Sequence, residues 1–219
     1  MRGKKGDDKI NSMSPISANE KQKLLKMSYD VNKKYYILLL LGFETGLRVS
    51  DLLKLKVKYF QANNHHIPII EQKTKKKRVL EFSASTLFLL QDYVFDKGLQ
   101  ADDFLIYSAE TRKDKPLGRT QAYRVIKKLS LACGIKNMGT HSLRKTFANE
   151  FIKNGGSVKK LQRILNHKHI STTRGYLVDF RPVETMEQKE HENMAFRIAR
   201  RLKRIWGCFN GYLGFKKKS

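Results

Sequence analysis

Apolar residues recur at helical spacing in the first part of the chain. Ser17 and Glu20 have the spacing of a capping box and apolar positions follow on one face, which predicts a helix beginning there. A second helix is predicted over residues 33–44, where an almost continuous apolar run indicates burial on most sides. Gly46 is placed to end that helix with a positive φ, and a third helix is predicted just after Arg48.

The pattern changes to short β-like runs over residues 66–82. The runs IPII and RVLEF flank the basic stretch QKTKKK, which predicts a β-hairpin with a lysine-rich turn. The helical period returns over residues 84–97, residues 104–107 are expected to be a short strand or extended, and the polar residues 108–118 are predicted to form a loop. Further helices are predicted over residues 120–132, 141–153, 157–165 and 171–177. The fold class is therefore mainly α with one small antiparallel β-sheet (α+β).

The two ends of the chain differ from its middle. Residues 1–13 are charged without apolar periodicity, which is typical of a disordered basic arm, whereas residues 14–182 are predicted to form the main folded domain. Residues 183–219 are predicted to hold a basic amphipathic helix and a tail. Its apolar stripe contains Met194, Ile198, Leu202 and Ile205. That stripe is expected to dock on its own domain or on a neighbouring subunit, in preference to a membrane surface.

Charge indicates the class of partner. The 219 residues include 45 Lys+Arg against 20 Asp+Glu, a formal net charge of +25. Such an excess repels itself unless a polyanion is the usual partner. Because basic residues run from Lys4 to Lys218, a localised basic tail does not account for the charge, and a nucleic acid is the expected partner.

Cysteine content and hydropathy indicate the cellular compartment of the protein. Only Cys133 and Cys208 occur, which make neither a disulfide framework nor a four-ligand zinc site and fit a reducing cytosol. The longest apolar run, residues 35–43, is too short to span a bilayer, and the N-terminus is not signal-like. We therefore expect a cytoplasmic protein without a membrane partner.

Three segments carry residue types that suit chemistry on a phosphodiester: TGLRVSDLLKLK, THSLRKTFANEF and LNHKHISTTRGYL. Arg48 and Arg144 supply two guanidinium forks suited to clamp the non-bridging oxygens of a transition state. His141 lies one helical turn before Arg144 and can carry a proton, and His167 can donate another hydrogen bond. Tyr176 can attack as a phenolate that the cations favour and form a covalent phosphotyrosine.

Together these segments resemble the tyrosine recombinase (phage integrase) family. The family's order is an Arg in a T-G-L-R context, then H-x-L-R, a His or Trp, and a Tyr in a T-T-x-x-Y context. From His141 to Arg144, His167 and Tyr176 the successive steps are 3, 23 and 9 residues. The resemblance covers residues 14–181. It implies the family's catalytic-domain fold and site-specific breaking and rejoining of double-stranded DNA through a 3′-phosphotyrosine, with no metal and no other cofactor.

The resemblance also assigns an acid for the leaving 5′ oxygen. In the family this acid is a lysine of the hairpin turn, and EQKTKKKRVLEF is similar to the family's Q-x-K-T-G-K turn. Lys73 precedes the Thr and takes this role, while Lys75, Lys76 and Lys77 are competitors for it and are expected to contact DNA. Asn166 departs from the pattern because Gly is common there, but Asn tolerates a left-handed backbone.

Further DNA contacts are expected from the segment GRTQAYRVIKK. Its side chains that can reach a groove or the backbone are Arg119, Gln121, Arg124 and Lys128. An ordinary basic surface helix explains the same pattern. In the family the segment after the nucleophile often packs onto a neighbouring protomer. The resemblance thus implies a homo-tetramer on paired sites, formed through the predicted C-terminal helix, and a location on the nucleoid.

Each of these residues has a simpler interpretation when taken alone. Arg48 has Asp51 one turn later as an ion-pair partner, and the lysine run is typical of a solvated turn. His141 could be a capping or packing histidine, and Tyr176 a half-buried aromatic residue with a hydrated hydroxyl. The joint order and spacing of the segments favour an active site.

A metal site and a phosphate-binding loop are disfavoured. His-Lys-His at residues 167–169 and His-His at residues 65–66 resemble metal pairs, but no Asp, Glu or Cys cluster accompanies them and the surrounding charge is basic. Gly-Gly at residues 155–156 lacks a following Lys-Ser/Thr in the required register, so a turn between helices is predicted.

Two other functions stay open. A type IB topoisomerase-like enzyme uses similar chemistry but relaxes supercoils as a monomer, and a DNA-binding regulator would keep the fold without turnover. The full set of five polar residues favours an active strand transferase. Many family members carry a separate core-binding domain before the first Arg. We therefore expect either a small invertase-type member that uses the catalytic domain alone or a fragment.

Overall fold

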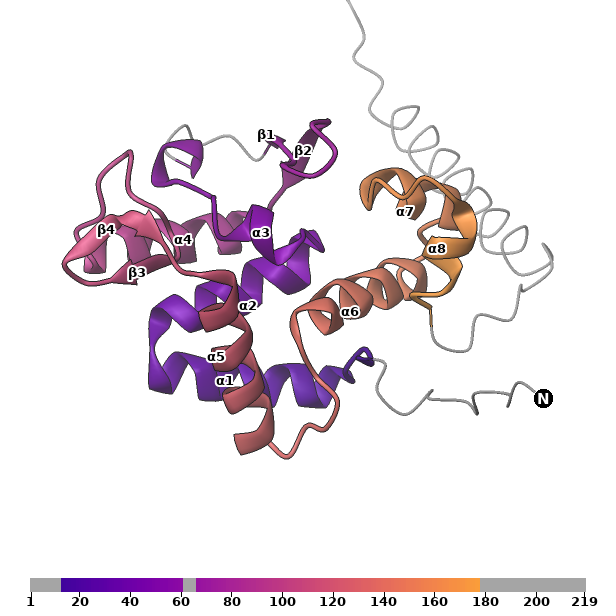
Figure 1. The fold of residues 1–219 in the computed structure, drawn as a ribbon, viewed down its shortest axis with the longest axis horizontal. Helices are drawn as coiled ribbons and strands as arrows, with labels where there is room; N and C mark the ends of the chain where they lie inside the picture. Colours follow the sequence, from indigo (N-terminus) through magenta and orange to yellow (C-terminus); the bar gives the residue numbers. More distant parts are fainter. Residues whose placement is uncertain (1–12, 61–65, 178–219) are drawn as a thin grey trace, which may run out of the picture. The chain divides into compact units, whose positions relative to one another are not determined.

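The computed structural model describes residues 13–60 and 66–177 (Figure 1). Its helices are α1 (Ala18–Val31), α2 (Lys33–Thr45), α3 (Val49–Leu52), α4 (Ala84–Asp96), α5 (Arg119–Ala132), α6 (Thr140–Lys153), α7 (Val158–Ile164) and α8 (Ile170–Arg174), with a short 3-10 helix η2 (Val57–Phe60). Its strands are β1 (His66–Ile70), β2 (Lys77–Glu81), β3 (Tyr107–Ala109) and β4 (Arg112–Pro116). The predicted C-terminal helix and all but Met13 of the predicted arm lie outside the described residues.

The caps predicted for the first two helices are present. The Ser17 hydroxyl accepts from the Glu20 backbone N–H at 3.3 Å, and the Glu20 carboxylate accepts from the Ser17 N–H at 2.8 Å. Helix α2 ends at Gly46, which has φ +56° and donates its N–H to the carbonyl of Gly42 at 3.1 Å. The capping box and the left-handed end of α2 are therefore both confirmed.

Helix α2 runs through the centre of the core. Nearly every side chain from Ile37 to Phe43 is buried, as its uninterrupted apolar run predicts. It packs against α1 and α6. A Cβ added at Gly42 would lie 2.7 Å from Leu143 Cδ1 on α6, so the glycine permits a close approach of the two helices. This approach brings the beginning of α6 to the C-terminal end of α2.

The predicted basic hairpin is confirmed. Strands β1 and β2 are antiparallel, with Ile67 opposite Leu80, and these two side chains are buried on one face. The turn occupies residues 71–76, and the Lys75 N–H donates to the carbonyl of Glu71 at 2.8 Å. Lys75 has φ +56°. It stands where the family's turn pattern has Gly, so a lysine occupies a left-handed position there.

The predicted loop over residues 108–118 is wrong, as is the prediction of a single sheet. Strands β3 and β4 form a second antiparallel hairpin inside this segment. The sequence hides it because the β4 side chains are polar and largely exposed, so they show no apolar alternation. The hairpin is held by backbone pairing and by the buried Tyr107, whose hydroxyl donates to Glu110 at 2.8 Å.

Two helices are shorter than predicted. Helix α3 is a single turn, although Leu52, Leu53 and Leu55 are buried as expected of its apolar positions, and α8 ends at Arg174. Residues 155–156 form the predicted turn between α6 and α7. The described chain is thus mainly helical with small antiparallel sheets, which agrees with the predicted fold class. Within the described ranges, no helix combines the length and the apolar character needed to cross a bilayer.

The left-handed backbone at Lys75 generates a prediction. A left-handed conformation costs a residue with a Cβ roughly 1–2 kcal/mol of stability. Gly avoids this strain, and the stability that it loses through its flexibility in the unfolded chain is smaller. Lys75→Gly is therefore expected to raise the free energy of unfolding by about 0.5–1 kcal/mol in urea titrations. Lys76→Gly, one residue along without a positive φ, is expected to lower it. Equal losses in the two variants would contradict the turn geometry.

Candidate active site

Three separate segments bring five of the six predicted catalytic residues together. Arg48 follows the turn that ends α2 and caps α3, whereas His141 and Arg144 lie in the first half of α6. His167 follows α7, and Tyr176 follows α8. The charges of Arg48 and Arg144 both act on the pKa of His141 and on that of His167, so these groups share one electrostatic environment.

Arg144 is the most buried of the five predicted catalytic residues that cluster here. The residue is 2% exposed. Its Nη1 donates to the carbonyl of Gly46 at 2.6 Å, and its Nη2 donates to the carbonyl of Leu165. These carbonyls cap the C-terminal ends of α2 and α7, where helices carry partial negative charge. Burial and the neighbouring Arg48 lower the pKa of Arg144, and a contact with the Tyr176 hydroxyl opposes that shift.

Arg48 is held by a carboxylate that sequence analysis did not single out. Its Nη1 donates to Glu71 Oε2 at 2.8 Å, and its side chain keeps 21% of its surface exposed. Asp51, the partner expected from helical spacing, instead accepts from the backbone N–H of Gln72 at 3.0 Å. Arg48 thus pairs with Glu71 rather than with Asp51, the partner that the simpler interpretation of Arg48 offered. Glu71 gave no local signal, because its pairing depends on the hairpin folding back to the end of α2.

Arg78 also joins this cluster without a sequence signal. It lies on β2, where its Nη2 donates to the carbonyl of Thr45 and its Nη1 lies 3.6 Å from Glu71 Oε1. Burial lowers the pKa of Arg78 to about 10, and the charges of Arg144 and Arg48 add to this while Glu71 opposes it. Two guanidiniums thus lie against one buried carboxylate, and the charge of that carboxylate also acts on the pKa of Arg144.

His167 and Tyr176 contact each other at the end of the described chain. Their ring centroids lie 4.9 Å apart at 63°, an edge contact. His167 Nδ1 lies 3.0 Å from the hydroxyl of the buried Thr173, and its Nε2 lies 3.5 Å from Arg144 Nη2. Burial first, then Arg144 and Arg48, lower the pKa of His167 to about 4. The ring is therefore neutral at pH 7 and carries one N–H, on Nδ1 beside Thr173 or on Nε2 beside Arg144, according to its tautomer.

The backbone around these two residues is fixed from both sides. Asn166 has φ +51°, so the prediction that Asn accepts a left-handed backbone here is confirmed. The amide of Asn149 on α6 donates to the carbonyl of Tyr176 at 2.9 Å and to that of Lys145 at 2.8 Å. The segment that carries Tyr176 is thereby tied to the helix that carries Arg144.

His141 is the more open of the two histidines. It lies in the first turn of α6 and keeps an exposed edge. Partial burial, followed by the charges of Arg144, Lys145, Arg48 and Arg119, lowers its pKa. A neutral imidazole at this position suits the acceptance of a proton at neutral pH.

The sixth predicted residue, Lys73, is not drawn into this cluster. It lies in the hairpin turn with its side chain exposed, as do Lys75 and Lys76, and Lys77 is exposed at the start of β2. The predicted DNA contacts on α5 all lie on its exposed side: Arg119, Gln121, Arg124 and Lys128. Arg119 is near enough to influence His141. These placements suit the predicted roles, which stay predictions.

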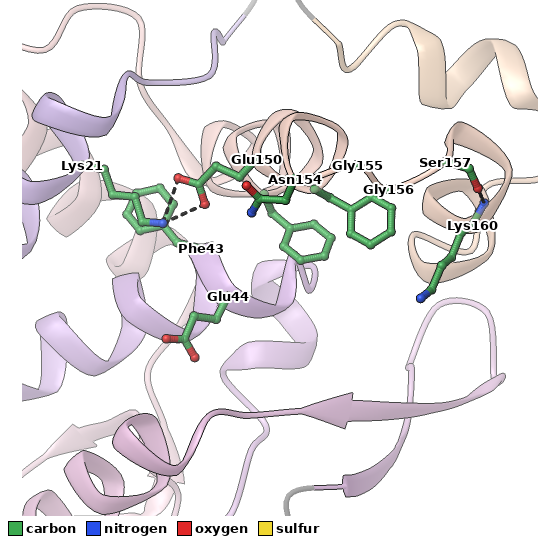
Figure 2. A pocket seen from close by; sticks show the side chains of 11 residues that line it. Lys21, Phe43, Glu44, Glu150, Asn154, Gly155, Gly156, Ser157 and Lys160 are labelled. Atoms are coloured by element: carbon green, nitrogen blue, oxygen red, sulfur yellow. Dashed lines mark hydrogen bonds and ion pairs between the residues drawn. The ribbon is translucent and has the colours of Figure 1, made fainter. Parts of the chain in front are cut away.

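A cavity of about 610 Å³ lies elsewhere, along α1, α2, α6 and the turn after α6 (Figure 2). Its walls include Phe43 and Phe147, and Lys21 donates to Glu150 at its edge at 2.9 Å. Figure 2 shows Glu44 at the same cavity. None of the six predicted catalytic residues lines it. The candidate active site is therefore separate from this cavity.

Comparison with known proteins identifies the family. Residues 15–181 match the phage integrase family. The chain is 40% identical over 170 residues to a probable integrase/recombinase, YoeC, of Bacillus subtilis, covering 77% of this chain and 91% of that protein. It is 36% identical over 155 residues to the tyrosine recombinase XerA of Saccharolobus solfataricus, covering 71% and 48%. The chain thus spans about half the length of several of its relatives.

Solved structures show the same fold. A crystal structure of XerA recombinase aligns with a TM-score of 0.65 at 22% identity, covering 85% of this chain and 66% of that one. A structure of the Tn1549 transposon integrase with a circular intermediate DNA aligns with a TM-score of 0.66 at 18% identity, covering 87% and 68%. The predicted catalytic-domain fold is therefore confirmed.

The names of the relatives decide between the three functions inferred from sequence. They are integrases and tyrosine recombinases, which supports a DNA strand transferase over a type IB topoisomerase or a silent regulator. The resemblance drawn from the three motif segments is confirmed as well. The chain belongs to the phage integrase family, that of the tyrosine recombinases.

Proposed function

We propose that this chain breaks and rejoins double-stranded DNA at specific sites with Tyr176 as the nucleophile. The observation that carries the proposal is the gathering of two guanidiniums, two neutral imidazoles and one phenol from three separate segments. Such a set binds a phosphate, moves a proton and supplies an attacking oxygen without a metal ion.

Arg48 and Arg144 would clamp the two non-bridging oxygens of the scissile phosphate. Arg144 is held by two backbone carbonyls, so its orientation is set before DNA arrives. Arg48 uses one amino group on Glu71 and keeps its exposed edge for the ligand. Donors held in place stabilise the developing charge without reorganisation during the reaction.

Proton transfer would run between the phenol, the imidazole and the leaving oxygen. The neutral His141 accepts the Tyr176 proton as the phenol oxygen attacks phosphorus, which forms a 3′-phosphotyrosine and breaks the bond to the 5′ oxygen. Lys73 gives its proton to that leaving oxygen. Attack by a 5′ hydroxyl of another strand end reverses both steps and reseals the DNA, so no external energy source is required.

Binding to DNA would rest mainly on phosphate contacts. The net charge of +25, the exposed lysines of the hairpin turn and the exposed basic side of α5 all support this. Affinity is then expected to fall steeply with salt. Solved relatives include XerH bound to its difH substrate, which aligns with a TM-score of 0.62 at 22% identity, covering 85% of this chain and 56% of that one.

Assembly would place four copies on paired sites. A lambda integrase structure of the same fold is a tetramer bound to a Holliday junction. The basic amphipathic segment at residues 183–206 is the proposed contact between copies, because its apolar stripe requires a partner surface. Nucleoid association follows from the DNA partner.

The nucleophile is tested by covalent capture. Native protein is incubated with a pool of randomised duplexes, and DNA that stays attached after denaturation identifies a target. A nicked duplex of that target then traps the adduct, because the short strand end diffuses away. We expect Tyr176→Phe to lose the adduct completely, since a benzene ring offers no attacking oxygen.

Tyr123→Phe is the matched control, because Tyr123 is an exposed tyrosine on α5 outside the five-residue cluster. It is expected to form the adduct at the native rate. An adduct that persists in Tyr176→Phe, or one that maps to another residue by peptide sequencing, would refute Tyr176 as the nucleophile.

The acid role of Lys73 is tested by changing the leaving atom. A thiol ionises near pH 8.5, so a sulfur in place of the bridging 5′ oxygen leaves without a proton donor. Lys73→Ala is expected to slow cleavage of the oxygen substrate by about 10²-fold or more and to leave cleavage of the sulfur substrate near the native rate. Lys26→Ala is the control, because Lys26 is an exposed lysine on α1, and it is expected to cleave both substrates at the native rate. If Lys73→Ala slows both substrates equally, Lys73 is not the acid.

The assembly role of the C-terminal segment is tested by deletion. A chain that ends at Arg181 is expected to retain detectable cleavage but to form smaller complexes on DNA, because the apolar stripe between copies is gone. Sedimentation velocity of the protein on its target duplex measures this. Unchanged sedimentation of the shortened chain would refute the proposal.

A further inference from the structure

We infer that Glu71 is a positioning residue for strand cleavage, whose buried carboxylate fixes Arg48 and the turn that carries Lys73. The inference rests on the proposed function, because it takes Arg48 as a phosphate clamp. Glu71 touches neither of the reacting groups, Tyr176 and the leaving oxygen, in the proposed reaction. It acts through its neighbours.

The contacts of Glu71 converge from four directions. The residue is 0% exposed and directly follows β1. Its Oε2 accepts from Arg48 Nη1 at 2.8 Å and from the Thr74 hydroxyl at 3.0 Å. Its Oε1 faces Arg78 Nη1 at 3.6 Å, and within the described residues neither of these two atoms has a hydrogen bond. The amide of Asn166 completes the set.

Charge explains why a carboxylate stands here. Arg48, Arg78 and Arg144 act on one another through a poorly hydrated region, and mutual repulsion helps to lower the pKa of the last two. Burial alone would favour a protonated Glu71, but Asn166, Thr74 and the arginine charges outweigh it and lower the pKa of this carboxyl. Glu71 is therefore the anion that allows Arg48 to lie beside Arg144 before a phosphate arrives.

The same residue also shapes the turn ahead of it. Its backbone carbonyl accepts from the Lys75 N–H at 2.8 Å, and its N–H donates to the Lys76 carbonyl at 3.0 Å. Together with the Thr74 hydroxyl, these bonds close the loop that presents Lys73. The Glu71 side chain thus positions Arg48, and the Glu71 backbone shapes the turn that carries Lys73, the proposed acid.

The role predicts opposite effects on binding and on cleavage. A negative charge near the phosphate opposes DNA binding, so removing it leaves affinity equal or greater. The same removal frees Arg48 from its fixed position, which slows the chemical step. A residue that only stabilises the fold would instead weaken binding and cleavage together, since both need folded protein.

The experiment measures both quantities in Glu71→Gln, which keeps the side-chain shape and removes the charge. Single-turnover cleavage of the captured target, at protein concentrations that saturate the DNA, is expected to slow roughly tenfold to a hundredfold. The Kd for the uncleaved duplex is expected to stay equal or fall. Glu81→Gln is the matched control, because Glu81 ends β2 as an exposed carboxylate. It is expected to match native protein in both measurements.

Combination with Arg48→Lys tests whether Glu71 acts through Arg48. If it does, the double variant cleaves no more slowly than Arg48→Lys alone, because the group that Glu71 orients is already lost. Multiplied losses in the double variant would overturn this route. Native-like cleavage by Glu71→Gln would overturn the inference outright.

Misfolding of Glu71→Gln and failure of the proposed function are each distinguished from failure of this inference. If Glu71→Gln fails to fold, Thr74→Val decides the matter, since it removes only the hydroxyl bonded to Glu71 Oε2. Slower cleavage with unchanged Kd in Thr74→Val supports the inference, and native cleavage overturns it. Absence of any adduct with native protein is a failure of the proposed function, whereas native adducts with equal rates in Glu71→Gln are a failure of this inference alone.

Discussion

The Arg144 guanidinium donates to the carbonyls of Gly46 and Leu165, and these bonds join α6 to the ends of α2 and α7. Because an unpaired buried charge is costly, the two helix ends must stay close to α6 for the fold to persist. Arg48 follows Gly46 by two residues and His167 follows Leu165 by two, so the same bonds bring the other groups of the site into range. Because Gly42 has no side chain, α2 can lie close enough to α6 for these bonds to form.

The clustered arginines repel one another, and the chain offsets this repulsion with few anions. Helix ends supply partial negative charge to Arg144 and Arg78, and Glu71 supplies a full one to Arg48. In the DNA-bound state a phosphate would add a second anion to this balance. The excess positive charge favours the binding of an anion. Burial, followed by this charge, lowers the pKa of both histidines and keeps them neutral at pH 7.

Local signals predicted the parts of this site that lie within one segment. Spacing in the chain located Arg48, His141, Arg144, His167 and Tyr176, and turn chemistry located Gly46 and Asn166, because these features depend on neighbouring residues. Glu71 and Arg78 were missed because their roles arise from contacts with Arg48 and Thr45, which lie more than twenty residues away in the chain. Strand β4 was missed for a different reason, since its polar and largely exposed side chains leave no hydrophobic alternation.

In the proposed reaction, one phosphate sits between Arg48 and Arg144 with the Tyr176 oxygen on its phosphorus. A crystal structure of the native chain trapped on a nicked target duplex tests this directly. Continuous density is expected from the Tyr176 oxygen to a 3′ phosphate, with both guanidiniums on its non-bridging oxygens. A phosphate bound elsewhere, or either guanidinium turned away from it in every copy, would refute this arrangement.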